Sequence, residues 1–143
     1  MKAIKLILSF LLISAATSFA QTAHHTYTQK SPNKIKVDPK VSKKLLKEVE
    51  QGKAYLVDVR TPEEYNEKHL KNAQNINIKS PEFAAKISKL DKNKPVYLYC
   101  RSGNRSGQAT DSLIALGYKS SYNIGSLDSI ASKGFPLDKA AIK

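Results

Sequence analysis

The chain has 143 residues, which is enough for one domain with a single hydrophobic core. It contains 24 Lys or Arg against 12 Asp or Glu, and its formal net charge is +12. The basic residues are scattered, and no basic strand carries aromatic side chains, so we expect no nucleic-acid partner. The charge is instead expected to favour solubility and anionic substrates.

The first twenty residues have the pattern of a secretory signal peptide. Lys2 and Lys5 precede an apolar run over 6–13, and small residues close the segment. The run is shorter than the ~20 apolar residues that a membrane span needs. We therefore expect cleavage after Ala20, a periplasmic or secreted protein, and no stable membrane insertion of the mature chain. An uncleaved anchor is the alternative.

Residues 21–34 are polar and are predicted to form a flexible leader before a folded domain that spans 35–143. Short apolar runs bounded by turn residues predict strands at 35–37, 54–60, 73–78, 96–99 and 120–124. Helical spacing and capping residues predict helices at about 38–51, 61–69, 80–90, 107–116 and 127–132. This alternation favours an α/β fold with a mostly parallel sheet.

The only cysteine, Cys100, stands between the predicted strand 96–99 and the predicted helix 107–116. The N–H groups of a loop that opens into a helix lack helical partners, and the helix dipole adds partial positive charge there. Arg101 and Arg105 add two full charges. Such surroundings lower a cysteine pKa from ~8.5 to roughly 3.5–7.5, so we expect a nucleophilic thiolate at neutral pH. The alternative is a buried structural cysteine.

Three segments, in order, resemble the signatures of rhodanese domains. They are Val-Asp-Val-Arg-Thr-Pro-Glu-Glu-Tyr at 57–65, His-Leu-Lys-Asn-Ala-Gln-Asn-Ile at 69–76, and Tyr-Cys-Arg-Ser-Gly-Asn-Arg-Ser at 99–106. Leu-Gly-Tyr at 116–118 and Gly-Phe-Pro at 134–136 match the closing marks of the family. With the signal peptide, the chain most resembles the exported single-domain members.

The resemblance implies a central, mostly parallel five-stranded sheet flanked by helices on both faces. It also implies a reaction without metal or cofactor. Cys100 would attack the outer sulfur of thiosulfate, release sulfite, and pass the sulfur of its persulfide to cyanide or a thiol acceptor. The loop residues that would bind the substrate are Arg101, Ser102, Gly103, Asn104, Arg105 and Ser106. The residues expected to give structural support are Asp58, Arg60 and His69.

The sequence departs from the family pattern at a few positions. Asn72 stands where glycine is usual, and asparagine tolerates a positive φ, so the turn is expected to survive. Asn77 replaces a usual proline at little expected cost. Ser126 and Ile130 stand in a stretch where paired glycines and a tryptophan are common, and they affect the expected shape of the last loop and the pocket wall.

Two other functions remain open from the residues. Dual-specificity phosphatases and arsenate reductases also use a cysteine loop that ends near an arginine, but their loops are longer than the four residues between Cys100 and Arg105. A non-catalytic module that binds an envelope partner, or a redox or persulfide carrier, is the second alternative. With one cysteine, any redox cycle would need a thiol from another molecule.

Overall fold

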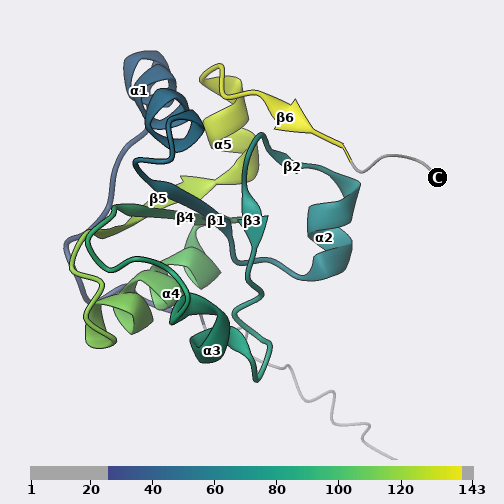
Figure 1. Ribbon diagram of the computed structural model, residues 1–143. Helices are drawn as coiled ribbons and strands as arrows, with labels where there is room; N and C mark the ends of the chain where they lie inside the picture. Colours follow the sequence, from purple (N-terminus) through teal and green to yellow (C-terminus); the bar gives the residue numbers. More distant parts are fainter. Residues whose placement is uncertain (1–25, 140–143) are drawn as a thin grey trace, which may run out of the picture.

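The computed structural model describes residues 26–139, so the predicted signal peptide lies outside the described residues. Within them, a parallel sheet is covered by helices on both faces (Figure 1), which confirms the α/β prediction. The sheet has the spatial order β3-β1-β4-β5, and its strands are β1 (Tyr55–Asp58), β3 (Gln74–Asn75), β4 (Val96–Cys100) and β5 (Ser121–Ser126). A separate antiparallel pair joins β2 (His69–Leu70) to β6 (Leu137–Asp138).

The sheet therefore has four strands, whereas the sequence predicted five. The predicted edge strand 35–37 is reduced to a single parallel bridge between Lys34 and Asn123 and a 3.0 Å hydrogen bond from the Ile35 N–H to the Asn123 carbonyl. The ladder ends there because the chain turns into a helix almost at once. Asp38 caps that helix, and its first residue, Pro39, has no N–H to give to a ladder.

Five helices complete the fold of residues 26–139. They are α1 (Pro39–Glu50), α2 (Pro62–Glu67), α3 (Phe83–Ile87), α4 (Asn104–Ala115) and α5 (Leu127–Ser132). Helices α1 and α5 cover one face of the sheet, and α3 and α4 cover the other (Figure 1). No helix within residues 26–139 is long and apolar enough to cross a membrane.

The strand side chains alternate between two separate cores. Leu56, Tyr97 and Tyr99 belong to the core beneath α1 and α5, whereas Leu98 and Cys100 belong to the core beneath α3 and α4. Each core is closed by helices, which explains why the strand sequences are almost continuously apolar. Each fully buried aliphatic side chain contributes about 1.5–3 kcal/mol. Because successive strand side chains point to opposite faces of the sheet, the side chain of Cys100 faces α4.

The predicted turns agree with the backbone at the positions that need special geometry. Asn72 has φ 64°, as its substitution for glycine required, and Gly117 has φ 93° just beyond α4. Helix α4 begins at Asn104, earlier than predicted, because Gly103 adopts φ 90° and turns the chain directly from the loop into the helix. Leu116, the last residue of the predicted helix 107–116, lies just beyond the last helical residue and is 42% exposed.

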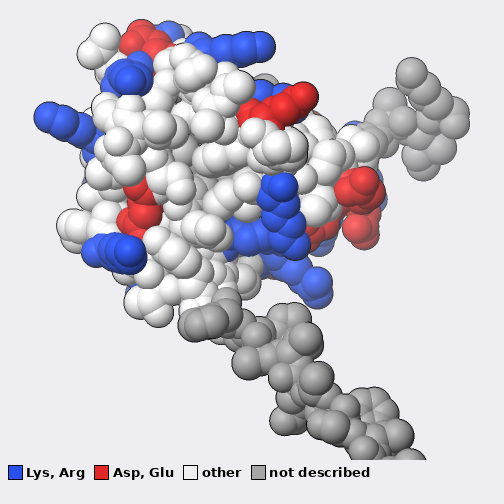
Figure 2. All heavy atoms as spheres, turned by 90° about the horizontal axis from the view of Figure 1, so that it is seen from below, with Lys and Arg blue, Asp and Glu red and all other residues white. Residues whose placement is uncertain are grey.

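The basic side chains do not form one continuous stripe on the face shown in Figure 2. Lys and Arg lie at several separate places there, with acidic side chains between them. The basic residues are therefore scattered on this surface, as they are along the sequence.

Candidate active site

Cys100 is the last residue of β4 and lies at the carboxyl end of the sheet, where parallel α/β folds place their sites. Its sulfur accepts hydrogen bonds from the Gly103 N–H at 3.1 Å and from the Ser106 hydroxyl at 3.4 Å. Burial by itself raises the pKa of the Cys100 thiol, but the Ser106 hydroxyl and the N–H groups of the loop outweigh it. The pKa of Cys100 therefore lies below its ordinary value, and the thiolate is favoured.

The cysteine is enclosed, while the outer residues of its loop are open to solvent. Cys100 is 0% exposed and packs in the core beneath α4, whereas Arg101 and Ser102 are exposed. The Ser102 hydroxyl accepts from the Asn104 N–H at 3.4 Å, which keeps the turn compact. A molecule that reacts with the sulfur must therefore enter past the exposed part of the loop.

Arg105 does not present a free charge, although the sequence assigned it to substrate attraction. Its two terminal nitrogens donate to the two carboxylate oxygens of Glu64 at 2.7 and 2.8 Å, which is a bidentate pair. The hydrogen bonds from Arg105 lower the pKa of Glu64 to about 2, against the opposing effect of burial. Glu64 stays ionised and compensates the charge of Arg105 at neutral pH.

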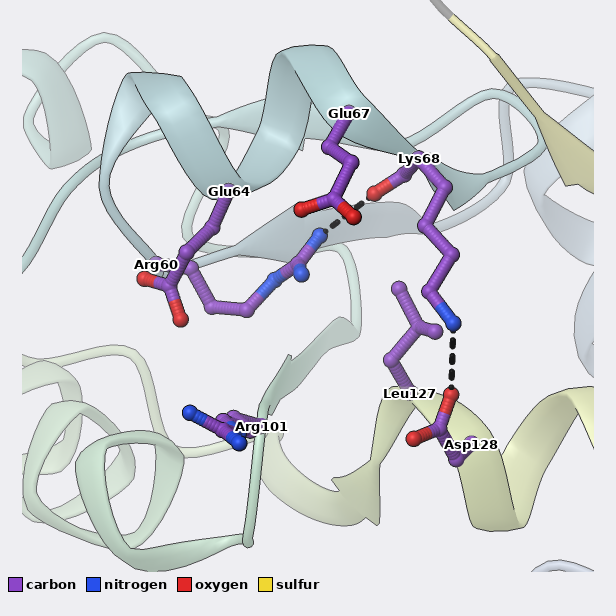
Figure 3. Close-up of a pocket in the computed structure, with 7 residues that line it drawn as sticks. All are labelled: Arg60, Glu64, Glu67, Lys68, Arg101, Leu127 and Asp128. Carbon is purple, nitrogen blue, oxygen red and sulfur yellow. Dashed lines mark hydrogen bonds and ion pairs between the residues drawn. The ribbon is translucent and has the colours of Figure 1, made fainter.

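A pocket of about 280 Å³ lies between α2, the cysteine loop and the start of α5. Figure 3 shows Arg101 on the opposite side of this pocket from α2. Lys68 is paired with Asp128 at 3.0 Å across the pocket. The lining residues are Arg60, Glu64, Glu67, Lys68, Arg101, Leu127 and Asp128. The pocket is thus lined by charges of both signs, with Leu127 as its apolar wall.

Asp58 and Arg60 form a buried ion pair at the end of β1. The guanidinium donates to the carboxylate at 2.9 and 2.6 Å, and it also donates to the Lys68 carbonyl at 2.7 Å. The Asn75 amide donates to the carbonyls of both residues at 3.0 and 2.9 Å. These contacts tie β1, β3 and the end of α2 together, which fits the structural role that we expect for the pair.

His69 lies in β2 and is held by local contacts. Its Nδ1–H donates to the Tyr65 carbonyl at 2.9 Å, and its ring stacks on the Tyr65 ring at a centroid distance of 3.8 Å. It is absent from the pocket lining, unlike Arg60. The geometry gives His69 a packing role at the end of α2.

The predicted flexible leader 21–34 is described only from residue 26 onward, and that part packs on α4. The Asp111 carboxylate accepts from the Tyr27 hydroxyl and the Lys30 N–H, both at 2.7 Å, and from the Ser31 N–H at 2.9 Å. The Tyr27 N–H donates to the Asn104 side chain at 2.9 Å. One carboxylate on α4 therefore satisfies three donors of the segment that the sequence predicted to be a flexible leader.

The two departures near the end of the chain have structural roles. The Ser126 hydroxyl accepts from the Ser129 N–H at 3.3 Å and caps α5, and Ile130 is 0% exposed within the core beneath that helix. Neither residue is part of the pocket lining.

Three residues near the cysteine loop were not predicted from the sequence. Glu64 was predicted only as part of the helix 61–69 and of the 57–65 signature, although its ion pair with Arg105 brings α2 to the site. Asn123 and Gln29 hydrogen-bond to each other at 2.9 Å beside the loop. One local signal was available for Asn123, because an amide between Tyr122 and Ile124 of a predicted strand needs buried partners.

Comparison with known proteins identifies the family. A family model described as a rhodanese-like domain matches residues 41–133. Thiosulfate sulfurtransferase PspE of Escherichia coli (strain K12) is 40% identical over 75 residues, which cover 52% of this chain and 72% of that protein. Thiosulfate sulfurtransferase 18 of Arabidopsis thaliana is 34% identical over 108 residues, which cover 67% of this chain and 76% of that protein.

A solved structure of a rhodanese with anions from E. coli is 36% identical, with a TM-score of 0.51, and the match covers 60% of this chain and 98% of that one. The fold, the cysteine loop at the end of its central strand and the family match together show that this chain belongs to the rhodanese-like family, which includes sulfurtransferases.

Proposed function

We propose that the protein is a thiosulfate sulfurtransferase that works through a persulfide on Cys100. The Cys100 thiolate attacks the outer sulfur of thiosulfate, the S–S bond of thiosulfate breaks, and sulfite leaves with the bonding electron pair. Cyanide or a thiolate acceptor then attacks the terminal sulfur of the persulfide and returns Cys100 as a thiolate. Both steps are displacements at sulfur, so the proposal includes no cofactor.

The observation that supports this proposal most strongly is the hydrogen bonding of the sulfur. The Gly103 N–H donates to the Cys100 sulfur and the Ser106 hydroxyl lies 3.4 Å from it, and donors held in place by the surrounding fold stabilise an anion. The same donors would hold the thiolate before the first step and the anionic persulfide after it. A structural core cysteine has no need of such donors.

Arg101 is the residue that we assign to attraction of the anionic donor. It is exposed, it follows Cys100 in the loop, and it lines the pocket on the side opposite α2. Arg105 contributes less attraction because the Glu64 carboxylate already accepts from both of its terminal nitrogens and compensates its charge. We assign Ser102 and Asn104 to the shape of the exposed part of the cysteine loop.

The proposal is tested by treating the protein with thiosulfate and measuring its intact mass. We expect the gain of one sulfur atom, its loss on addition of cyanide with formation of thiocyanate, and no gain in Cys100→Ser. A Cys100 that alkylates readily but never gains sulfur would refute the transfer mechanism and support a redox or partner-binding module. Hydrolysis of an aryl phosphate above the rate of Cys100→Ser would support the phosphatase alternative.

We also propose that the protein is exported and that cleavage after Ala20 leaves a periplasmic or secreted mature chain. The charged start and the short apolar run over 6–13 support this proposal. Fractionation of expressing cells followed by N-terminal sequencing tests it, with Gln21 as the expected first residue. A chain that is found uncleaved in the cytoplasm would contradict it.

A further inference from the structure

Asn123 on β5 lies beside the cysteine loop, is 8% exposed, and uses both ends of its amide. Its nitrogen donates to the Gly103 carbonyl and to the Gln29 side-chain carbonyl, both at 2.9 Å. Its oxygen accepts from the Ser106 hydroxyl at 2.7 Å and from the Gly125 N–H at 3.0 Å. Two of these four hydrogen bonds join the amide to Gly103 and Ser106, the two residues that contact the Cys100 sulfur.

The orientation of this amide is fixed by backbone groups. The Gly125 N–H can only donate, and the Gly103 carbonyl can only accept, so the oxygen of Asn123 must face the first and its nitrogen the second. The oxygen that faces Gly125 also faces Ser106. Asn123 is therefore an acceptor toward the Ser106 hydroxyl.

The Ser106 hydroxyl has one hydrogen and two acceptors within reach. The Asn123 oxygen lies 2.7 Å from the hydroxyl oxygen, whereas the Cys100 sulfur lies 3.4 Å from it. A hydroxyl donates only one hydrogen bond at a time, although its oxygen can accept others. When Cys100 is a thiol, its S–H can donate to the Ser106 oxygen while the Ser106 hydrogen stays on Asn123. When the sulfur is an anion, it competes for that hydrogen.

We propose that Asn123 is a positioning residue that competes with the Cys100 sulfur for the single hydroxyl hydrogen of Ser106. The competition limits how strongly the loop stabilises the sulfur anion. The nucleophilicity of a thiolate falls as its pKa falls, so a sulfur that is stabilised too strongly attacks more slowly. The role of this competition in sulfur transfer rests on the proposed function, whereas its effect on the titration of the Cys100 thiol does not.

The segment before the domain takes part in this arrangement through Gln29. The Gln29 amide nitrogen donates to the carbonyls of Ser31 and Asn33 at 3.1 and 3.0 Å, so its own carbonyl is held toward Asn123. Gly107 makes room for both side chains. A Cβ at Gly107 would lie 3.2 Å from the Gln29 oxygen and 3.3 Å from the Asn123 nitrogen.

The charged groups around the sulfur come from the loop, α4, α2 and the end of β1, and a change at Asn123 leaves them intact. They are Arg101 in the loop, Arg105 on α4 with Glu64 on α2, and the Asp58–Arg60 pair at the end of β1. None of these side chains hydrogen-bonds to the Asn123 amide within residues 26–139. A shift in the titration of Cys100 on substitution of Asn123 with an apolar residue can therefore be assigned to Ser106 and the loop.

The test is the rate of alkylation of Cys100 by iodoacetamide as a function of pH, which does not depend on sulfur transfer. Asn123→Leu removes the competing acceptor, and we expect the midpoint of the profile to fall by about half to one pH unit. Asn123→Asp keeps an acceptor at the same place and adds negative charge, so its midpoint is expected to rise. Gln108→Leu, an equivalent change on the exposed face of α4, is expected to leave the midpoint unchanged.

The combination with Ser106→Ala separates competition from general disorder of the loop. In that background the hydroxyl is gone, so Asn123→Leu is expected to produce no further shift. The proposal is overturned if Asn123→Leu and Asn123→Asp both raise the midpoint, if Asn123→Leu leaves it unchanged, or if the Asn123→Leu shift persists without the Ser106 hydroxyl. Thermal unfolding of each variant establishes that the measured protein is folded.

Discussion

The ion pair between Glu64 and Arg105 gives the sharpest prediction, because it affects both stability and donor binding. Glu64→Gln removes the negative charge but keeps an oxygen that accepts from the Thr61 N–H, so the capping box of α2 can persist. What is lost is the charge that now faces Arg105 at 2.7 and 2.8 Å. The variant therefore isolates the ion pair from the helix cap.

The magnitude follows from the titration of Glu64. A pKa of about 2 in place of 4.5 corresponds to about 3 kcal/mol if it is converted in full. The side chains of Arg105 and Glu64 are 22% and 28% exposed, so solvent screens the pair, and Thr61 supplies part of the effect. We therefore expect Glu64→Gln to lower the free energy of unfolding at neutral pH by about 1–2 kcal/mol.

The sign of the pH dependence is fixed by the direction of the pKa change. Because folding lowers the pKa of Glu64, its contribution is fully present above the unfolded value near 4.5 and is lost as the pH falls toward about 2. The difference between Glu64→Gln and the original protein in urea unfolding should therefore shrink between neutral pH and about pH 3. A difference that stays constant over this range would refute the assignment of the lowered pKa.

The same variant should bind the anionic donor more tightly, since Arg105 regains a free charge. We expect a lower KM for thiosulfate, with a stronger dependence on ionic strength. Glu63→Gln is the matched control, because it makes the same change in net charge in the same first turn of α2 but is exposed. Equal changes in KM for Glu63→Gln and Glu64→Gln would show that net charge, and not Arg105, is responsible.

Two further substitutions test the support of the site. Arg60→Ala leaves the fully buried Asp58 without its cation, so we expect the free energy of unfolding, measured in urea, to fall by about 3–5 kcal/mol. Lys68→Ala removes a partner of an exposed ion pair and should cost far less. A similar loss of stability in both variants would contradict the argument from burial. Gly103→Ala forces φ 90° on alanine and should cost about 1–2 kcal/mol and slow alkylation of Cys100. Gly52 also has a positive φ, of 67°, but lies away from the loop, so Gly52→Ala should cost similar stability without slowing alkylation of Cys100. Slower alkylation in both variants would refute a local effect of Gly103.

Residue patterns along the chain were sufficient to predict how the four sheet strands alternate with helices and where the cysteine loop lies. Apolar runs that alternate with capped helices predicted the α/β fold, and the cysteine between a buried strand and a helix predicted the position of the loop. Asn72 was expected to accept a positive φ, and it does. These features depend on residues a few positions apart, so periodicity, caps and turn residues were enough to predict them.

The groups that surround Cys100 could not be predicted from these patterns, because they come from distant parts of the chain. The charge of Arg105 is compensated by a residue 41 positions away, the Ser106 hydroxyl is shared with a residue 17 positions away, and Tyr27 reaches Asp111 across 84 positions. The same holds for the sheet, where the fifth strand was replaced by one bridge and residues 26–34 packed on α4. Such contacts depend on the packing of distant elements against one another, and local sequence patterns contain no information about that packing.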